Sequence, residues 1–170
     1  IEVQAAYSST CPASAALARQ LVQENFRSQF LKSSKQGLIE ISDVYNWLGS
    51  SDWIHATPHA QRSYARVKIQ LASTENPQNT CSAETLINLL EEVLQTPVQG
   101  IVKREDEQEF ALLNGQNLMF CEDAGRRVKL ALEDLKFVVD YCGEFRHMES
   151  LHPHDAVSLI SKGRRLSFEN

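Results

Sequence analysis

The segment 149–155 holds the densest group of side chains that could do chemistry. It reads Glu-Ser-Leu-His-Pro-His-Asp, so the imidazoles of His152 and His154 lie close to the carboxylates of Glu149 and Asp155. Neutral imidazole is the most common metal ligand among side chains and the usual proton shuttle near neutral pH. Two histidines in a loop are more often solvated than ligating, so this segment alone does not define a site.

Three further candidates lie at the ends of expected elements. Cys11 stands where a strand passes into a helix, His59 lies in a loop before a strand, and Glu107 ends a dense charge cluster. Functional residues concentrate at such positions. Together with His152 or His154 they form a sulfur, nitrogen and oxygen ligand set that suits zinc and leaves room for manganese or iron. The alternative is that Cys11 is packed, His59 caps a loop and Glu107 is solvated.

Composition narrows the class of protein. The chain has 170 residues, 42% of them hydrophobic, which indicates a globular protein with one domain. It contains no apolar run long enough to span a membrane, and its net charge of −5 argues against a nucleic-acid-binding surface. The four cysteines are widely spaced and no signal peptide precedes them, so we expect reduced thiols and a cytoplasmic location. The first residues begin a strand without Met, which is typical of a fragment or a processed piece.

Hydrophobic periodicity predicts an α+β domain. The early and late strands alternate cleanly, which favours an antiparallel sheet with the helices on one face. Ser14 is the expected N-cap of the first helix, Asn114-Gly115 is expected to form a turn, and polar segments are expected at 33–37, 73–80 and 162–170. The predicted elements are a strand at 1–9, helices at 15–31 and 41–48, a strand at 64–71, helices at 82–94 and 117–135, and strands at 137–146 and 156–161.

Five motifs in one order along the chain resemble those of the type IB GTP cyclohydrolases. The motifs are Cys11-Pro12-Ala13-Ser14, His59-Ala60-Gln61-Arg62-Ser63, Lys103-Arg104-Glu105-Asp106-Glu107, Cys121-Glu122-Asp123 and Glu149-Ser150-Leu151-His152-Pro153-His154. These enzymes depend on a metal and open the purine ring of GTP to start folate synthesis. The resemblance implies the tunnelling fold, ββααββ, as a single domain over 1–170, with a helical insertion at 15–58 between the first two strands.

The resemblance also implies a metal site for Zn, Mn or Fe. Its ligands would be Cys11, His59, Glu107 and a histidine of the late motif. His152 is favoured as that ligand, and His154 is second or acts as proton shuttle. Cys11, His152 and His154 are therefore the candidate catalytic residues.

Glu122 matches the second acidic position of the family, fifteen residues after Glu107. Its carboxylate would accept the guanine N1–H and 2-amino group in parallel. Arg62, Lys103 and Arg104 would bind the triphosphate through charge-assisted hydrogen bonds. The implied reaction is attack of a metal-activated water on guanine C8, with a histidine moving protons, loss of formate, and closure to 7,8-dihydroneopterin triphosphate.

Two departures from the family keep alternatives open. Ala13 stands where the family has a second Cys, and family members usually carry a first half before this region. The chain thus resembles the C-terminal half of a longer enzyme, which is expected to work as a homo-oligomer with sites at subunit interfaces. One alternative is a non-catalytic fragment or interaction module of the same fold. Another is a different tunnelling-fold pterin or deazapurine enzyme, with Cys11 as a nucleophile toward a nitrile, although no nicotinamide signature is visible.

Overall fold

The computed structural model describes residues 1–31, 38–73, 81–163 and 168. The polar segments expected at 33–37, 73–80 and 162–170 lie wholly or largely outside the described residues. The chain divides into two compact units, one formed by Ile1–Thr10 with Ala60–Asn170 and the other by Cys11–His59. No helix among the described residues is long and apolar enough to cross a membrane.

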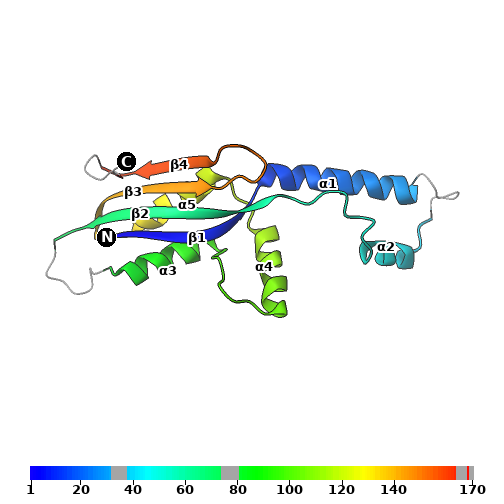
Figure 1. The fold of residues 1–170 in the computed structure, drawn as a ribbon, viewed down its shortest axis with the longest axis horizontal. Coiled ribbons are helices and arrows are strands. Elements are labelled where there is room, and N and C mark those ends of the chain that lie inside the picture. Colours follow the sequence, from blue (N-terminus) through cyan, green and yellow to red (C-terminus); the bar gives the residue numbers. More distant parts are fainter. Residues whose placement is uncertain (32–37, 74–80, 164–167, 169–170) are drawn as a thin grey trace. The chain divides into compact units, whose positions relative to one another are not determined.

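The larger unit is built on one antiparallel sheet (Figure 1). Its described strands are β1 (Glu2–Thr10), β2 (Ala60–Leu71), β3 (Val138–His147) and β4 (Ala156–Ser161), which lie side by side in the order β1-β2-β3-β4. Every neighbouring pair is antiparallel. The prediction of an α+β unit with an antiparallel sheet is confirmed.

Three helices lie between β2 and β3 in the chain: α3 (Ala83–Leu94), α4 (Arg104–Gln116) and α5 (Cys121–Asp134). Helix α3 packs against β1 and against α5, while α5 packs against β3 and β4. At Gly125 the helix lies so close to the sheet that an added Cβ would come within 2.9 Å of the Ser158 hydroxyl. The absence of a side chain at Gly125 therefore lets α5 pack closely on the sheet.

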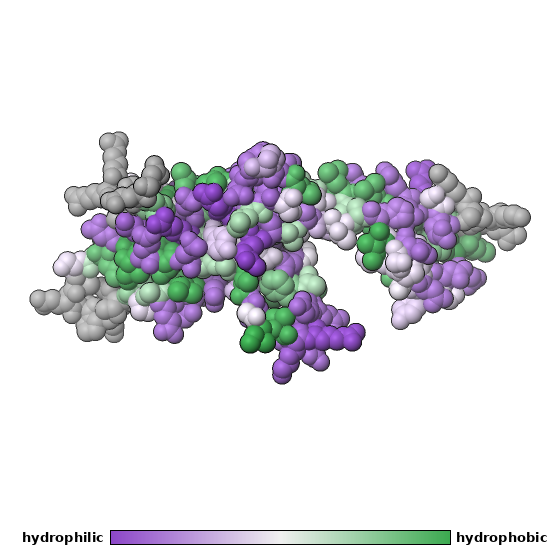
Figure 2. All heavy atoms as spheres, viewed as in Figure 1, coloured by the Kyte–Doolittle hydropathy of each residue, from purple (hydrophilic) through white to green (hydrophobic). Residues whose placement is uncertain are grey.

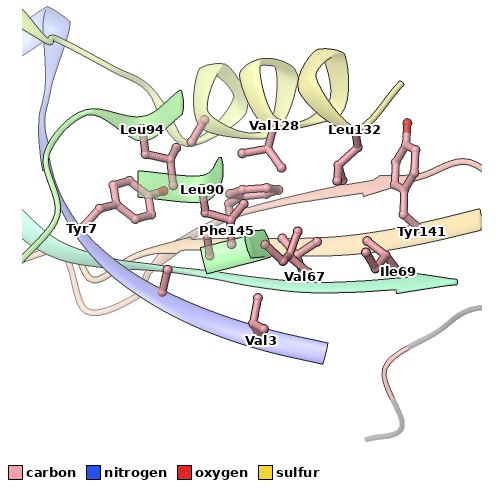
Figure 3. Packing of buried hydrophobic residues seen from close by; sticks show 14 of the residues in the cluster. Val3, Tyr7, Val67, Ile69, Leu90, Leu94, Val128, Leu132, Tyr141 and Phe145 are labelled. Atoms are coloured by element: carbon pink, nitrogen blue, oxygen red, sulfur yellow. The ribbon is translucent and has the colours of Figure 1, made fainter. Parts of the chain in front are cut away.

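The hydrophobic core lies between the sheet and helices α3 and α5 (Figure 3). On β1 and β2 every second side chain enters it, which is the period of two that the sequence shows. A fully buried aliphatic or aromatic side chain contributes roughly 1.5–3 kcal/mol to folding. The largest fully buried side chains include Tyr7, Ile69, Leu86, Leu90, Leu132, Tyr141 and Phe145.

Helix α4 was not among the predicted elements. None of its residues is buried, so it carries no apolar stripe for periodicity to detect. Figure 2 shows both hydrophilic and hydrophobic residues around this helix. The turn predicted at Asn114-Gly115 is wrong, because both residues lie within α4. The Asn114 side chain donates to the Phe110 carbonyl at 2.8 Å and accepts the Ser8 hydroxyl at 2.6 Å, so its polar atoms are used without a turn.

Helix α5, which corresponds to the helix predicted at 117–135, begins at Cys121 and not near Asn117. The intervening residues pair with the end of β1 instead, and the Met119 amide donates to the Thr10 carbonyl at 3.1 Å. The buried Asn117 side chain donates to the Leu94 carbonyl at 2.7 Å, which ends α3 beside this segment. Tertiary hydrogen bonds thus replace the first helical turn that the sequence suggested.

The smaller unit contains α1 (Pro12–Phe26), a π-helical segment η1 (Arg27–Leu31) and α2 (Ile41–Leu48). Phe26, Phe30 and Trp47 form its aromatic cluster, with ring centroids 5.0–5.8 Å apart. Two leucines of α1, Leu17 and Leu21, are exposed.

Candidate functional site

Cys11 and His59 are held together at the ends of two paired strands. Cys11 follows Thr10 of β1 and His59 precedes Ala60 of β2, and these two strand residues are partners in the sheet. The Cys11 amide donates to the His59 carbonyl at 3.2 Å. The structure therefore brings together two predicted ligands that lie far apart in the sequence.

The predicted N-cap of α1 is wrong. Cys11 occupies that position, with Pro12 as the first helical residue, and its Sγ accepts the Ser14 amide at 3.5 Å. The Ser14 hydroxyl instead accepts the His59 amide at 3.0 Å. The carbonyl and the amide of His59 thus both join the His59 loop to the start of α1. The candidate ligands Cys11 and His59 are both half-buried.

Glu107 and Arg62 line one pocket of about 250 Å³. Glu107 comes from the first turn of α4 and Arg62 from the start of β2, and both side chains are exposed. The hollow therefore offers one anionic and one cationic group to a ligand. The remaining lining residues are Ser8, Val98, Gln99, Val102 and Phe110.

The charge cluster at 103–107 forms the exposed start of α4. Lys103 is the N-cap and Arg104 the first helical residue. The Asp106 carboxylate accepts the Lys103 amide at 2.8 Å, which fixes this turn. Two cations therefore stand beside a helix N-terminus, where unpaired backbone amides and the helix dipole also favour an anion.

Glu122 lies exposed in the first turn of α5. Its neighbour Asp123 accepts the Phe120 amide at 3.1 Å and binds Arg126 at 2.7 Å. Asp123 therefore fixes the helix start, and the Glu122 carboxylate extends from a turn that is held in place. Sequence reasoning gave no role to Asp123 or to Asp106, although the pattern of an acidic residue three positions after an N-cap is a known signal.

His152 and His154 lie exposed in the loop between β3 and β4. Their rings are stacked, with centroids 5.6 Å apart and planes 20° from parallel. The structure therefore places the two candidate imidazoles next to each other, within reach of a common ligand.

A buried polar cluster lies at the base of this loop. The His147 Nε2 is 3.0 Å from the Tyr7 hydroxyl, and both side chains are almost fully buried. Burial lowers the pKa of His147 to about 4 and raises the pKa of Tyr7 above its usual range. Both groups are therefore neutral near pH 7, and they share one hydrogen bond whose direction depends on the imidazole tautomer. Burial also raises the pKa of Cys121 to about 11, and its thiol donates to the Phe145 carbonyl at 3.2 Å.

None of these buried groups except Cys121 falls in a motif, and sequence reasoning missed His147 and Tyr7. Tyr7 shows only the alternation of a strand, and His147 lies at the end of β3 without a chemical pattern around it. Their pairing joins residues near opposite ends of the chain, which no local signal reveals.

The donor types fit a divalent transition metal, since thiolate, imidazole and carboxylate are its usual protein ligands. Within the described residues, however, no group of three or more His, Cys, Asp or Glu side chains gathers closely enough to hold a metal ion. What the structure provides is a Cys11–His59 pair, a pocket lined by Glu107, and a His152–His154 pair.

Comparison with known proteins adds to this geometry. A family model described as Type I GTP cyclohydrolase folE2 matches residues 1–158. GTP cyclohydrolase FolE2 of Bdellovibrio bacteriovorus is 58% identical over 166 residues, which cover 98% of this chain and 52% of that protein. The protein of the same name from Hydrogenovibrio crunogenus is 51% identical over 162 residues, 95% of this chain and 50% of that protein. The chain spans about half the length of these curated relatives.

Proposed function

We propose that this chain, which belongs to the type I GTP cyclohydrolase folE2 family, forms part of an enzyme that converts GTP and water to 7,8-dihydroneopterin triphosphate and formate. This is the first step of folate biosynthesis, and we assign it to the cytoplasm. The observation that carries the proposal is the family match over residues 1–158. The position of each motif at or beside the end of a helix or strand supports it.

The larger unit is a tunnelling-fold domain in this proposal. The order of two strands, helices and two strands around a four-stranded antiparallel sheet supports it, with α4 as an addition to the ββααββ pattern. Residues 1–170 then correspond to the C-terminal half of a two-half enzyme, with 15–58 as an insertion. We further propose a homo-oligomer with sites at subunit interfaces. The lack of a three-ligand group among the described residues supports a site completed by other segments.

In the assembled enzyme, Cys11, His59, Glu107 and His152 would hold a divalent ion, Zn, Mn or Fe. Such an ion lowers the pKa of a water molecule so that hydroxide is available near neutral pH. The adjacency of Cys11 and His59 supports their role as a ligand pair, because one backbone hydrogen bond fixes the distance between their main chains.

Substrate recognition falls to residues at two helix starts. Glu122 accepts the guanine N1–H and the 2-amino group, so a ring that lacks the amino group binds less well. Lys103 and Arg104 at the start of α4, with Arg62 on β2, bind the triphosphate. The exposure of all four side chains supports this division.

The stacked histidines handle the protons. His154 takes a proton from the water that attacks guanine C8 and passes it to N7; the ring then opens as the C8–N9 bond breaks and N9 takes up a proton, which leaves a formyl group on N7. A second water hydrolyses this formyl group and releases formate, and the ribose then rearranges to a ketone that closes onto the freed nitrogen with loss of water. The 5.6 Å separation of the two rings supports a ligand in one and a shuttle in the other.

A matched pair of variants tests the assignment of Glu122. In the full-length enzyme, Glu122→Gln should raise KM for GTP at least about tenfold, because one of two parallel acceptors is lost. Glu91→Gln serves as the control, since Glu91 is exposed on α3, which carries none of the five motifs. Equal GTP binding by the two variants would remove the guanine role.

A non-catalytic module of the same fold is the second candidate. Ala13 at the family's second Cys position and the half-length coverage of the relatives favour it. Formate release by the full-length protein would exclude it.

A further inference from the structure

Two motif residues to which no role has been assigned, Gln61 and Glu149, contact each other. The Gln61 Nε2 donates to the Glu149 Oε1 at 3.2 Å. Gln61 is 7% exposed, so the carboxamide is shielded from water, and a hydrogen bond to a carboxylate is stronger than one between neutral groups. Beside it, the Met148 amide donates to the Arg62 carbonyl at 3.2 Å.

His147, which precedes Met148 and Glu149 in the chain, is also held by a hydrogen bond. The His147 imidazole is hydrogen-bonded to the buried Tyr7 hydroxyl of β1. Three consecutive residues, 147–149, are therefore tied to β1 or β2, each through a different group. Residues 150–154, which follow directly, are all exposed. The loop that carries His152 and His154 thus has a fixed stem and an exposed tip.

We propose that Gln61 is a positioning residue, whose carboxamide holds Glu149 and thereby orients the loop that carries His152 and His154. The inference rests on the proposed function for its catalytic consequence. Gln61 does not touch the reacting atoms in this account. It acts through Glu149, the last anchored residue before the two histidines.

The chemistry of the pair provides a sharp variant. Gln61→Glu keeps the size of the side chain but replaces the donor with a second carboxylate. Two carboxylates at hydrogen-bond distance repel each other, so the stem should open. In the Glu149→Gln background the same change restores a carboxylate beside a carboxamide, with donor and acceptor exchanged. Gln61→Met removes the hydrogen-bond donor and replaces the carboxamide with an apolar side chain of similar size.

The test measures kcat, KM for GTP and hydrogen exchange over residues 148–154 in the intact, Mn²⁺-loaded enzyme. We expect Gln61→Glu to lower kcat at least about tenfold, with KM for GTP changed less than about threefold because Glu122 is untouched. In the Glu149→Gln background the same substitution should cost less than about threefold. Hydrogen exchange over residues 148–154 should accelerate in Gln61→Glu and Gln61→Met. It should not accelerate in the double variant that combines Gln61→Glu with Glu149→Gln.

Unchanged exchange and unchanged kcat in both Gln61 variants would overturn the inference, as would an equal loss in the two backgrounds. The wild-type enzyme separates this result from the proposed function. If it releases no formate from GTP, the proposed function fails, while hydrogen exchange still reports whether Gln61 holds the loop.

Discussion

The amide of Cys11 donates to the carbonyl of His59 at 3.2 Å, so two predicted metal ligands from distant parts of the sequence lie side by side. Because Cys11 is also the N-cap of α1, its sulfur serves the helix as well as any bound metal. These two roles can be separated by substitution.

Cys11→Ser should abolish tight metal binding while leaving stability nearly unchanged. Serine is a preferred N-cap, so the hydroxyl still accepts the Ser14 amide, but the thiolate ligand is lost. We expect metal content far below that of the wild type, measured by elemental analysis after dialysis, with a Tm within about 2 °C. Cys11→Ala should lose the metal and also about 1 kcal/mol of stability. Full metal content in Cys11→Ser would exclude the thiolate as a ligand.

Asp123→Ala should weaken GTP binding through Glu122. The substitution removes the acceptor for the Phe120 amide and the ion pair with Arg126, so the turn that carries Glu122 frays. Loss of such a cap costs about 1 kcal/mol, which lowers Tm by about 2–4 °C in a chain of this size. We expect KM to rise while metal content stays constant. Asp123→Asn keeps an acceptor oxygen and should retain most of the binding; if Asp123→Ala leaves KM unchanged, Asp123 does not position Glu122.

Stability should fall with acid because of His147. Burial lowers its pKa from 6.5 to about 4 in the folded chain. The unfolded chain therefore binds more protons between these pH values, and the free energy of unfolding decreases as pH falls through this window. From pH 7.5 to 5 we expect a loss on the order of 2 kcal/mol from this residue, measured by urea unfolding. His147→Gln keeps a hydrogen-bonding group beside the Tyr7 hydroxyl without titrating, so the same loss in this variant would contradict the assignment.

The sheet and the core helices could be predicted from the sequence, because their hydrophobic residues recur with a regular period. The strands alternate, and α3 and α5 bury regular stripes such as Leu86, Leu90 and Leu94. The sequence does not predict helix α4, because no residue of it is buried. Its start is marked instead by the Asp106 carboxylate, which accepts the Lys103 amide. Helix α5 begins later than the sequence predicts, because Met119 is hydrogen-bonded to β1, a segment that is distant in the sequence.

The candidate site was predictable in its parts but not in its arrangement. Residue type and motif order pointed to Cys11, His59 and Glu107, and the structure sets two of these side by side. The buried pair of His147 and Tyr7 carries no local signal, because it forms only when the folded sheet brings side chains of β1 and β3 together across β2. The histidine loop could be named from the sequence, whereas its anchoring through Gln61 could not.

The most direct test of the central claim measures two products of one reaction. The full-length enzyme, loaded with Zn²⁺ or Mn²⁺, is incubated with GTP, and formate and 7,8-dihydroneopterin triphosphate are quantified together. We predict that both form in equal amounts, and that Cys11→Ser forms neither. Intact GTP after prolonged incubation with the metal-loaded wild type, or formate without the pterin, would contradict the account.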